Sequence, residues 1–275
     1  MTTQFLPPDR PLLAATLRAL PAGLLIVLIT RRVPQGAWWW KSLVLGALNI
    51  GVFFALLFLA AYRLPGGVAA TVGAVQPLLV TVLAAGILGE RITGLRVVAG
   101  VAGVFGVALL VLQATARLDL IGVLAALGGA VVMAVGTVLA KHWGQPAHPL
   151  VSTSWQLVAG GVVLVPILLL VEGLPTKSLT PVNLAGYAYL AILGTALSYT
   201  LWFRGIENLP VASVAFLGLL SPIVAVTFGW VLLQQTLSLG QVVGAAIVLG
   251  AVVATNAVSP GRPLKPARRA GVRRR

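Results

Sequence analysis

The chain has 275 residues, of which 59% are hydrophobic and 9% charged, and its mean hydropathy is +1.03. This balance excludes a soluble globular domain. The chain has no cysteine, which excludes disulfides and thiol catalysis, and its two histidines are too few for a metal site. We therefore expect no metal and no cofactor.

Apolar runs recur along the chain, and each is long enough to cross a bilayer core of roughly 30 Å. Backbone groups in lipid must be satisfied within the segment, so we predict an all-α polytopic membrane bundle. The alternating segments typical of a β-barrel do not occur. The nine predicted spans are 11–30, 42–61, 67–88, 95–113, 120–140, 150–171, 184–203, 210–233 and 238–257.

The formal charge of +14 is unevenly placed, because seven of the nineteen basic residues lie in the last fourteen positions. We predict that residues 258–275 form a basic disordered tail at anionic lipid headgroups, and that the protein does not bind nucleic acid. One set of alternate loops, with the tail, carries fourteen basic residues and the other set carries four. The positive-inside rule then places the C-terminus in the cytoplasm, and we expect a bacterial inner membrane.

The second half of the chain repeats breaker residues of the first half. A shift of 145 residues aligns Gly73 with Gly218, Pro77 with Pro222 and Phe58 with Phe203, and a shift of 138 aligns Arg18 with Gln156 and Gly23 with Gly161. We predict two inverted repeats of five helices, at 1–113 and 114–257. The first repeat has only four predicted helices, so we infer a ten-helix ancestral fold. We favour a coding sequence that begins before Met1 over the loss of the first helix.

Four segments carry a family resemblance. They are "LPPDRPLLAATLRALPAG" at 6–23, "GAVQPLLV" at 73–80, "GERITGLRVVAGVAGVFGVALLV" at 89–111 and "GLLSPIVAV" at 218–226. Over nearly all of residues 5–257 the chain resembles the EamA family of the drug/metabolite transporter superfamily. Within that family, "FLPPDRP" and "YRLPGGVAATVGAVQP" are similar to the pigment (indigoidine-type) exporter branch. The resemblance implies a ten-helix bundle with a central cavity and cytoplasmic termini, which exports small metabolites such as amino acids by alternating access.

Two spans carry a proline near their centre, each preceded by a polar residue. Proline removes an amide donor and crowds the carbonyl four residues earlier, where a glycine eases the bend. Broken helices at repeat-related positions point to a transport site. The alternative is a kink that only shapes packing. The predicted cavity and bend residues are Gly73, Gln76, Pro77, Gly218, Ser221 and Pro222.

Arg18 is the one charge well inside a predicted span, and a charge at this depth predicts function by default. It is a candidate partner for a substrate carboxylate, or alternatively a structural anchor that reaches helix-end carbonyls. Glu90 ends a span beside Arg91 and near Arg96, and we predict a structural ion-pair cluster at the interface. The remaining acids also fall at span ends or outside spans, so no carboxylate is expected at mid-membrane.

Aromatic and small polar residues gather in the second, fifth and seventh spans. Such a mixture suits an amphipathic metabolite, although aromatic side chains in a bundle also serve packing. The further cavity candidates are Asn49, Phe53, Thr137, Ser198, Tyr199 and Trp202.

Competing functions are distinguished by what the spans contain. Intramembrane hydrolysis needs a Ser–His or acid pair within the spans, and prenyl transfer needs acidic clusters. Neither occurs, so we predict no enzyme. We predict an exporter of small metabolites, whose partners are its substrate and the bilayer, acting as a monomer or weak homodimer. A lipid-carrier flippase or a membrane scaffold is the alternative.

Overall fold

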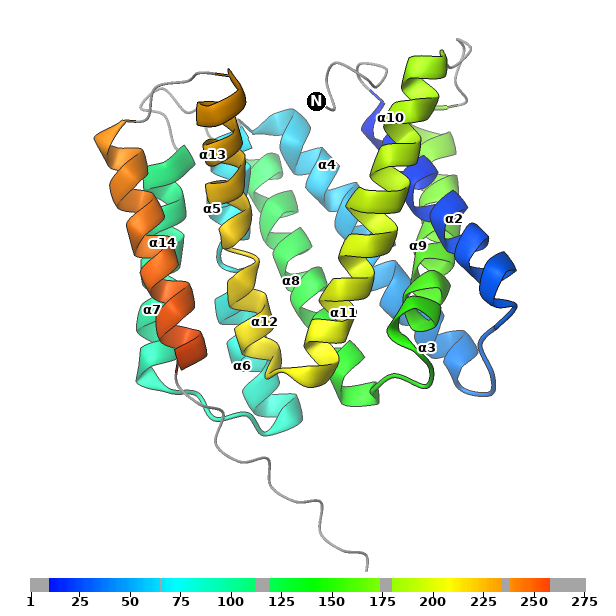
Figure 1. Cartoon of the computed structure of the whole chain (residues 1–275), viewed down its shortest axis with the longest axis horizontal. Helices are drawn as coiled ribbons and strands as arrows, with labels where there is room; N and C mark the ends of the chain where they lie inside the picture. Colours follow the sequence, from blue (N-terminus) through cyan, green and yellow to red (C-terminus); the bar gives the residue numbers. More distant parts are fainter. Residues whose placement is uncertain (1–9, 65, 112–118, 174–179, 234–237, 258–275) are drawn as a thin grey trace, which may run out of the picture.

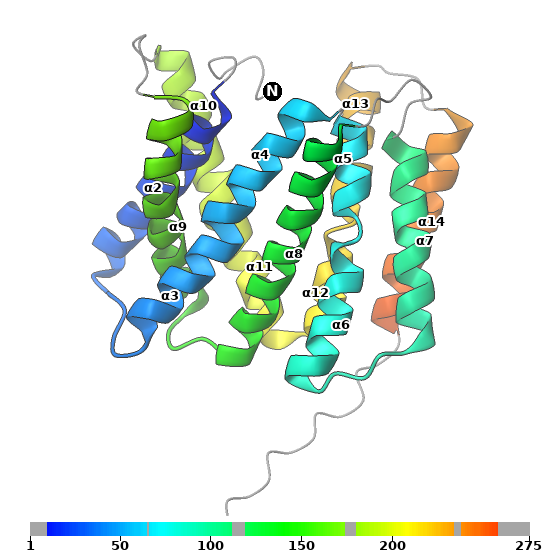
Figure 2. The ribbon, with the colours of Figure 1, turned by 180° about the vertical axis from the view of Figure 1, so that it is seen from behind.

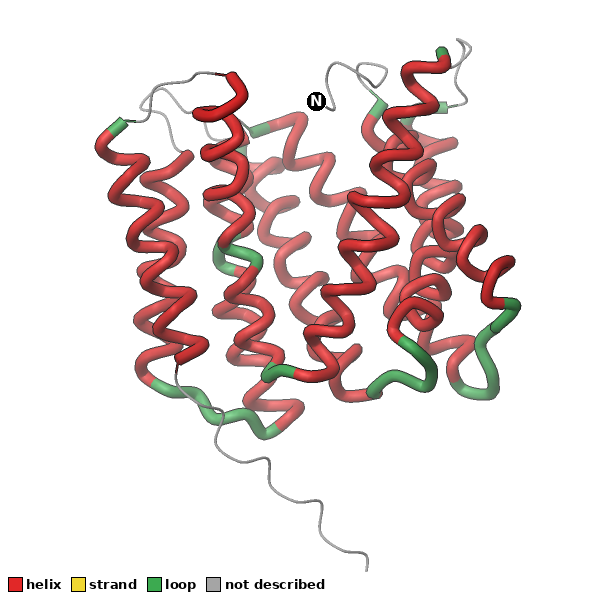
Figure 3. Tube along the Cα trace, viewed as in Figure 1, coloured by secondary structure: helices red, strands yellow, loops and turns green. Residues whose placement is uncertain are grey.

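The computed structural model describes residues 10–64, 66–111, 119–173, 180–233 and 238–257, and every regular element in these ranges is helical (Figure 1). The helices lie side by side and run between the two ends of one bundle (Figure 3). The predicted all-α polytopic bundle is therefore confirmed. The elements are α2 (Pro11–Thr30), α3 (Trp38–Gly46), η1 (Ala47–Val52), α4 (Phe53–Arg63), α5 (Gly66–Gly73), α6 (Gln76–Leu88), α7 (Gly94–Val111), α8 (Leu120–Trp143), α9 (Pro149–Val171), α10 (Pro181–Ala191), η2 (Ile192–Leu197), α11 (Ser198–Asn208), α12 (Val211–Leu217), α13 (Leu220–Leu233) and α14 (Leu239–Ala257).

Each of the nine predicted spans corresponds to one helical pass of the described chain. Seven passes are long and apolar enough to cross a membrane, and two shorter apolar helices complete the set. The second and seventh passes are longer than predicted, at Trp38–Arg63 and Pro181–Asn208. The predicted tail at 258–275 and the predicted repeat boundary at 113 lie outside the described residues.

Four of the passes are irregular, and they form two pairs. The third and eighth passes break between α5 and α6 and between α12 and α13, one turn or less before the proline of each. The second and seventh passes contain π-helical segments, η1 and η2, which begin and end 145 residues apart. The breaks follow from glycine and proline. The π segments were not predicted, and such segments are common at functional sites.

Small residues let the helices approach closely, as expected in a membrane where apolar burial gives no preference for helix over lipid. The pairs α2–α9 and α7–α14 have the most extensive contact, and α8 packs between α4 and α6 (Figure 2). A β-carbon on Gly46 would lie 2.5 Å from the carbonyl oxygen of Gln156 in α9. A β-carbon on Gly103 would lie 2.7 Å from Leu219, so this glycine serves packing.

Successive passes alternate in direction, so the loops after α2, α6, α8 and α11 and the end of α14 share one end of the bundle (Figures 1 and 2). Most basic residues of the described chain belong to that end. They are Arg31, Arg32, Lys41, Arg91, Arg96, Lys141 and Arg204, whereas Arg10 and Arg63 belong to the other end. The charge asymmetry of the sequence is thus an asymmetry between two ends of one bundle.

Candidate functional site

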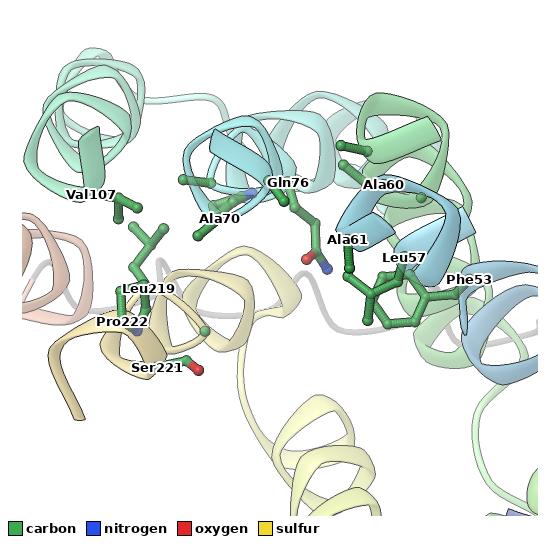
Figure 4. Close-up of a pocket in the computed structure, with 18 of the residues that line it drawn as sticks. Phe53, Leu57, Ala60, Ala61, Ala70, Gln76, Val107, Leu219, Ser221 and Pro222 are labelled. Atoms are coloured by element: carbon green, nitrogen blue, oxygen red, sulfur yellow. The ribbon is translucent and has the colours of Figure 1, made fainter. Parts of the chain in front are cut away.

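The two broken passes form facing walls of a cavity of about 510 Å³, which helices α4, α7 and α8 complete. Figure 4 shows Gln76 extending from one wall into the space between them, with Ser221 and Pro222 on the opposite wall. This space is large enough for a small metabolite. Of the predicted site residues, it is lined by Phe53, Gly73, Gln76, Pro77, Gly218, Ser221 and Pro222.

The chemistry of the cavity wall is almost wholly apolar. Among the described residues that line it, Gln76 and Ser221 alone have polar side chains, and none is charged. The remainder of the wall consists of alanine, glycine, leucine, valine, proline and phenylalanine, including Phe53 and Phe58. The wall can therefore bury an apolar solute and offer it one amide and one hydroxyl.

A second group of predicted residues forms a polar cluster behind the cavity wall. The Arg18 guanidinium carbon lies 4.0 Å from the centre of the Phe54 ring, and Arg18 also interacts with the Tyr199 side chain. The Tyr199 and Phe54 rings meet edge to face at 6.3 Å. Phe54 is fully buried, and Asn49 is fully buried as well. Of the predicted residues, Arg18, Asn49 and Tyr199 thus meet outside the cavity.

Two hydrogen bonds connect this polar cluster, from Tyr199 to Asn49 and from Asn49 to Gln156. The Tyr199 hydroxyl donates to the main-chain oxygen of Asn49 at 3.3 Å, and the Asn49 amide donates to Oε1 of Gln156 at 3.1 Å. Asn49 lies within η1, where the π geometry displaces the main chain from its regular bonding pattern. The π segment η1 of the second pass therefore accepts a hydrogen bond from a side chain of the seventh pass, which contains the other π segment.

The three remaining candidates lie elsewhere. Ser198 is exposed, and its hydroxyl donates to the carbonyl oxygen of Leu193 at 2.8 Å. The Trp202 ring lies 3.9 Å from where a β-carbon on Gly218 would stand, so it lies close to this glycine of the cavity wall. Thr137 is fully buried within α8, and its hydroxyl has no partner among the described residues. None of the three lines the cavity.

Glu90 has a structural role in addition to the predicted ion pair. One carboxylate oxygen lies 3.5 Å from Nη1 of Arg96, and the other accepts the Val211 amide at 3.0 Å. Glu90 therefore caps the start of α12 as well as pairing with an arginine. Arg91 contributes its main-chain oxygen, which Arg96 reaches at 3.2 Å, and no ion pair joins Glu90 and Arg91 in the described chain.

Sequence reasoning missed the π segments and the role of Gln156. Gln156 had appeared only as the repeat partner of Arg18, and no local pattern predicts a π segment. The described residues contain no group of histidine, cysteine or acidic side chains that could hold a metal. Within the described chain, the site therefore consists of neutral polar groups, aromatic rings and one guanidinium.

Comparison with known proteins decides what kind of membrane protein this is. The family model of the EamA-like transporter family matches residues 3–112 and 120–257. The chain belongs to the EamA-like transporter family. It is 49% identical over 251 residues to Protein PecM of Dickeya dadantii, which covers 90% of this chain and 84% of that protein. It is 27% identical to an uncharacterized transporter of Bacillus subtilis, YvbV, over 90% of this chain and 83% of the relative.

A solved crystal structure has the same fold, with a TM-score of 0.80 at 19% sequence identity. The match covers 93% of this chain and 90% of that one. Together with the family match, the apolar helices make this EamA-family protein a multi-pass membrane transporter. The family description and the name of the Bacillus subtilis relative both specify a transporter.

Proposed function

We propose that this transporter exports a small amphipathic metabolite across the bacterial inner membrane, by alternating access through the cavity between the two broken passes. The observation that carries the proposal is the composition of the cavity wall, which is apolar except for Gln76 and Ser221. A solute with an apolar, planar body and one or two hydrogen-bonding groups fits such a wall.

The same wall narrows the substrate class. A free amino acid is a zwitterion, and burying its ammonium group without a charged or strongly polar partner is costly. The described cavity lining supplies no carboxylate. Amphipathic compounds related to amino acids are therefore favoured over free amino acids.

Three further expectations accompany this function. The two broken passes act as matching hinges of two inverted repeats, divided near residues 113 and 114. The basic end of the bundle faces the cytoplasm. We also expect the protein to work as a monomer or weak homodimer.

The test is export by cells that express the full chain. Cells are loaded with labelled amino acids, purines and aromatic pigments, and efflux is compared with cells lacking the protein. Gln76→Ala and Ser221→Ala should each lower efflux of the exported compound several-fold, because each removes a hydrogen-bonding group from the cavity wall. Thr227→Ala is the matched control, since Thr227 lies on α13 and donates to its own helix at Ile223.

Membrane levels of each variant are measured, so that loss of protein is separated from loss of transport. Unchanged efflux in the double variant of Gln76 and Ser221 would refute the role of this cavity. Lipid scrambling by the purified protein in liposomes, without solute efflux, would instead favour the flippase alternative.

A further inference from the structure

Arg18 is a partly buried cation in α2 that has no carboxylate partner among the described residues. Its Nε atom is buried and makes no hydrogen bond within the described chain. Of the four described acids, Glu90 pairs with Arg96, Asp119 pairs with Arg63, and Glu172 accepts the amides of Leu12 and Leu13. Glu207 is exposed near the end of α11 and forms no ion pair with Arg18. A cation held inside a membrane protein in this way calls for an anion.

The groups around the guanidinium are neutral, and they leave part of it free. Phe54 offers the face of its ring at 4.0 Å, which attracts a cation without using its N–H donors. The Tyr199 proton is directed at the Asn49 main-chain oxygen, so only the Tyr199 oxygen can accept from Arg18. The Nε donor and the positive charge are both left for a ligand.

Two successive aromatic rings, Phe54 and then Phe53 or Phe58, link this cation to the cavity. Phe53 and Phe58 both line the cavity. Both rings also contact the ring of Phe54, at 5.6 Å and 6.3 Å between centroids. A rotation of these side chains would therefore join the guanidinium to the cavity as one continuous site, apolar at one end and cationic at the other.

The two halves of the chain contribute unequally to this cluster. The shift of 138 residues pairs Arg18 with Gln156, and the shift of 145 pairs Phe54 with Tyr199. All four side chains belong to the same cluster. The first half of the chain contributes the guanidinium of Arg18 and the phenyl ring of Phe54, whereas the second half contributes the amide of Gln156 and the phenol of Tyr199. The site accordingly holds a single positive charge, which matches a single negative charge.

We propose that Arg18, stacked on Phe54 beside Tyr199, is a subsite for the carboxylate of an aromatic or amphipathic organic anion. This inference rests on the proposed function, because it names the substrate class of the same transport site. The carboxylate meets the guanidinium, and the apolar body occupies the cavity that Gln76 and Ser221 line. Such charge-assisted pairs are the strong ones in a partly buried site.

The test is binding to the full-length protein, purified into lipid nanodiscs in HEPES buffer without added chloride or carboxylate. Benzoate is the probe and benzamide is its neutral match. Affinity is measured by titration calorimetry, which needs no transport. Benzoate should bind the wild type, and benzamide should bind at least about tenfold more weakly, because it lacks the charge. In Arg18→Gln the benzoate affinity should fall to that of benzamide. Arg63→Gln is the control, since Arg63 is a half-exposed arginine at the end of the bundle.

Each alternative outcome is decisive. Equal binding of benzoate and benzamide, or a benzoate affinity that Arg18→Gln leaves intact, would overturn the subsite. If chloride displaces benzoate completely at equal concentration, the site takes inorganic anions and the carboxylate assignment is wrong. Should Arg18→Gln fail to fold, Arg18→Lys replaces it and should bind benzoate several-fold more weakly, because the planar fork is lost; unchanged affinity would refute the proposal. The efflux test of the Gln76 and Ser221 variants can fail or succeed independently of this binding test on Arg18.

Discussion

The contact between α7 and α14 gives a stability prediction with an internal control. A β-carbon on Gly244 would lie 2.6 Å from the main-chain oxygen of Gly106 and 2.9 Å from the amide nitrogen of Leu110. Both atoms belong to the backbone of α7, so no flexible side chain can move aside. Since ordinary contacts begin at 3.4 Å, Gly244→Ala must separate the two helices locally by about 0.8 Å.

The cost follows from overpacking against a rigid neighbour. Such insertions typically cost ~1–3 kcal/mol, and the better helix propensity of alanine offsets up to ~1 kcal/mol of this. From the middle of that range we expect a net loss of about 1–2 kcal/mol. Gly250→Ala is the matched control on the same helix, because a β-carbon there would meet nothing within 4 Å. It should be neutral or stabilise by up to ~1 kcal/mol.

The assay is reversible unfolding of the purified protein in mixed micelles, titrated with a denaturing detergent and followed by tryptophan fluorescence. Gly244→Ala should unfold at a lower detergent fraction than the wild type, and Gly250→Ala should not. Equal stability of the two variants would refute the reasoning, because it would show that the α7–α14 contact accommodates a methyl group without separation.

Two more predictions concern residues that sequence reasoning placed at the interface or in the cavity. Glu90→Ala removes both the ion pair with Arg96 and the acceptor for the Val211 amide. It should lower the free energy of unfolding by ~1–3 kcal/mol in the same assay. Glu207→Ala, at an exposed site, is the control and should change it by no more than ~0.5 kcal/mol. Thr137→Val removes a buried hydroxyl without a partner in the described chain, so it should leave stability unchanged or raise it by up to ~1 kcal/mol and leave efflux unchanged. A loss of efflux with normal membrane levels would show instead that the Thr137 hydroxyl takes part in transport.

The helical passes could be predicted because the membrane allows few alternatives. An apolar run near 20 residues in a bilayer must form all its backbone hydrogen bonds within the segment, which makes it helical whatever its side chains are. The breaks before Pro77 and Pro222 could be predicted for a similar reason, since proline and glycine act on the main chain directly. The two breaks line one cavity, which agrees with the predicted pair of inverted repeats, because repeat-related residues would meet where two such halves face each other.

The π segments could not be predicted, because their cause lies in partners far along the chain. Asn49 carries no local signal for irregular geometry, yet its main-chain oxygen accepts Tyr199 from 150 residues away and its amide reaches Gln156 from 107 residues away. Periodicity reports which face of a helix is apolar, and it is silent on such contacts.

For Arg18, the sequence indicated a candidate function but not the neighbouring residues. Its position made it a candidate for binding a carboxylate, but nothing in the sequence indicated Phe54 as the ring beneath it. An arginine that only anchored helix ends would direct its donors at carbonyl groups. The guanidinium carbon of Arg18 instead lies over the buried Phe54 ring, and its Nε atom has no hydrogen bond in the described chain. The Nε donor lies two aromatic rings behind a cavity whose described lining carries no charge, and we propose that the charge and the apolar volume are two parts of one substrate site.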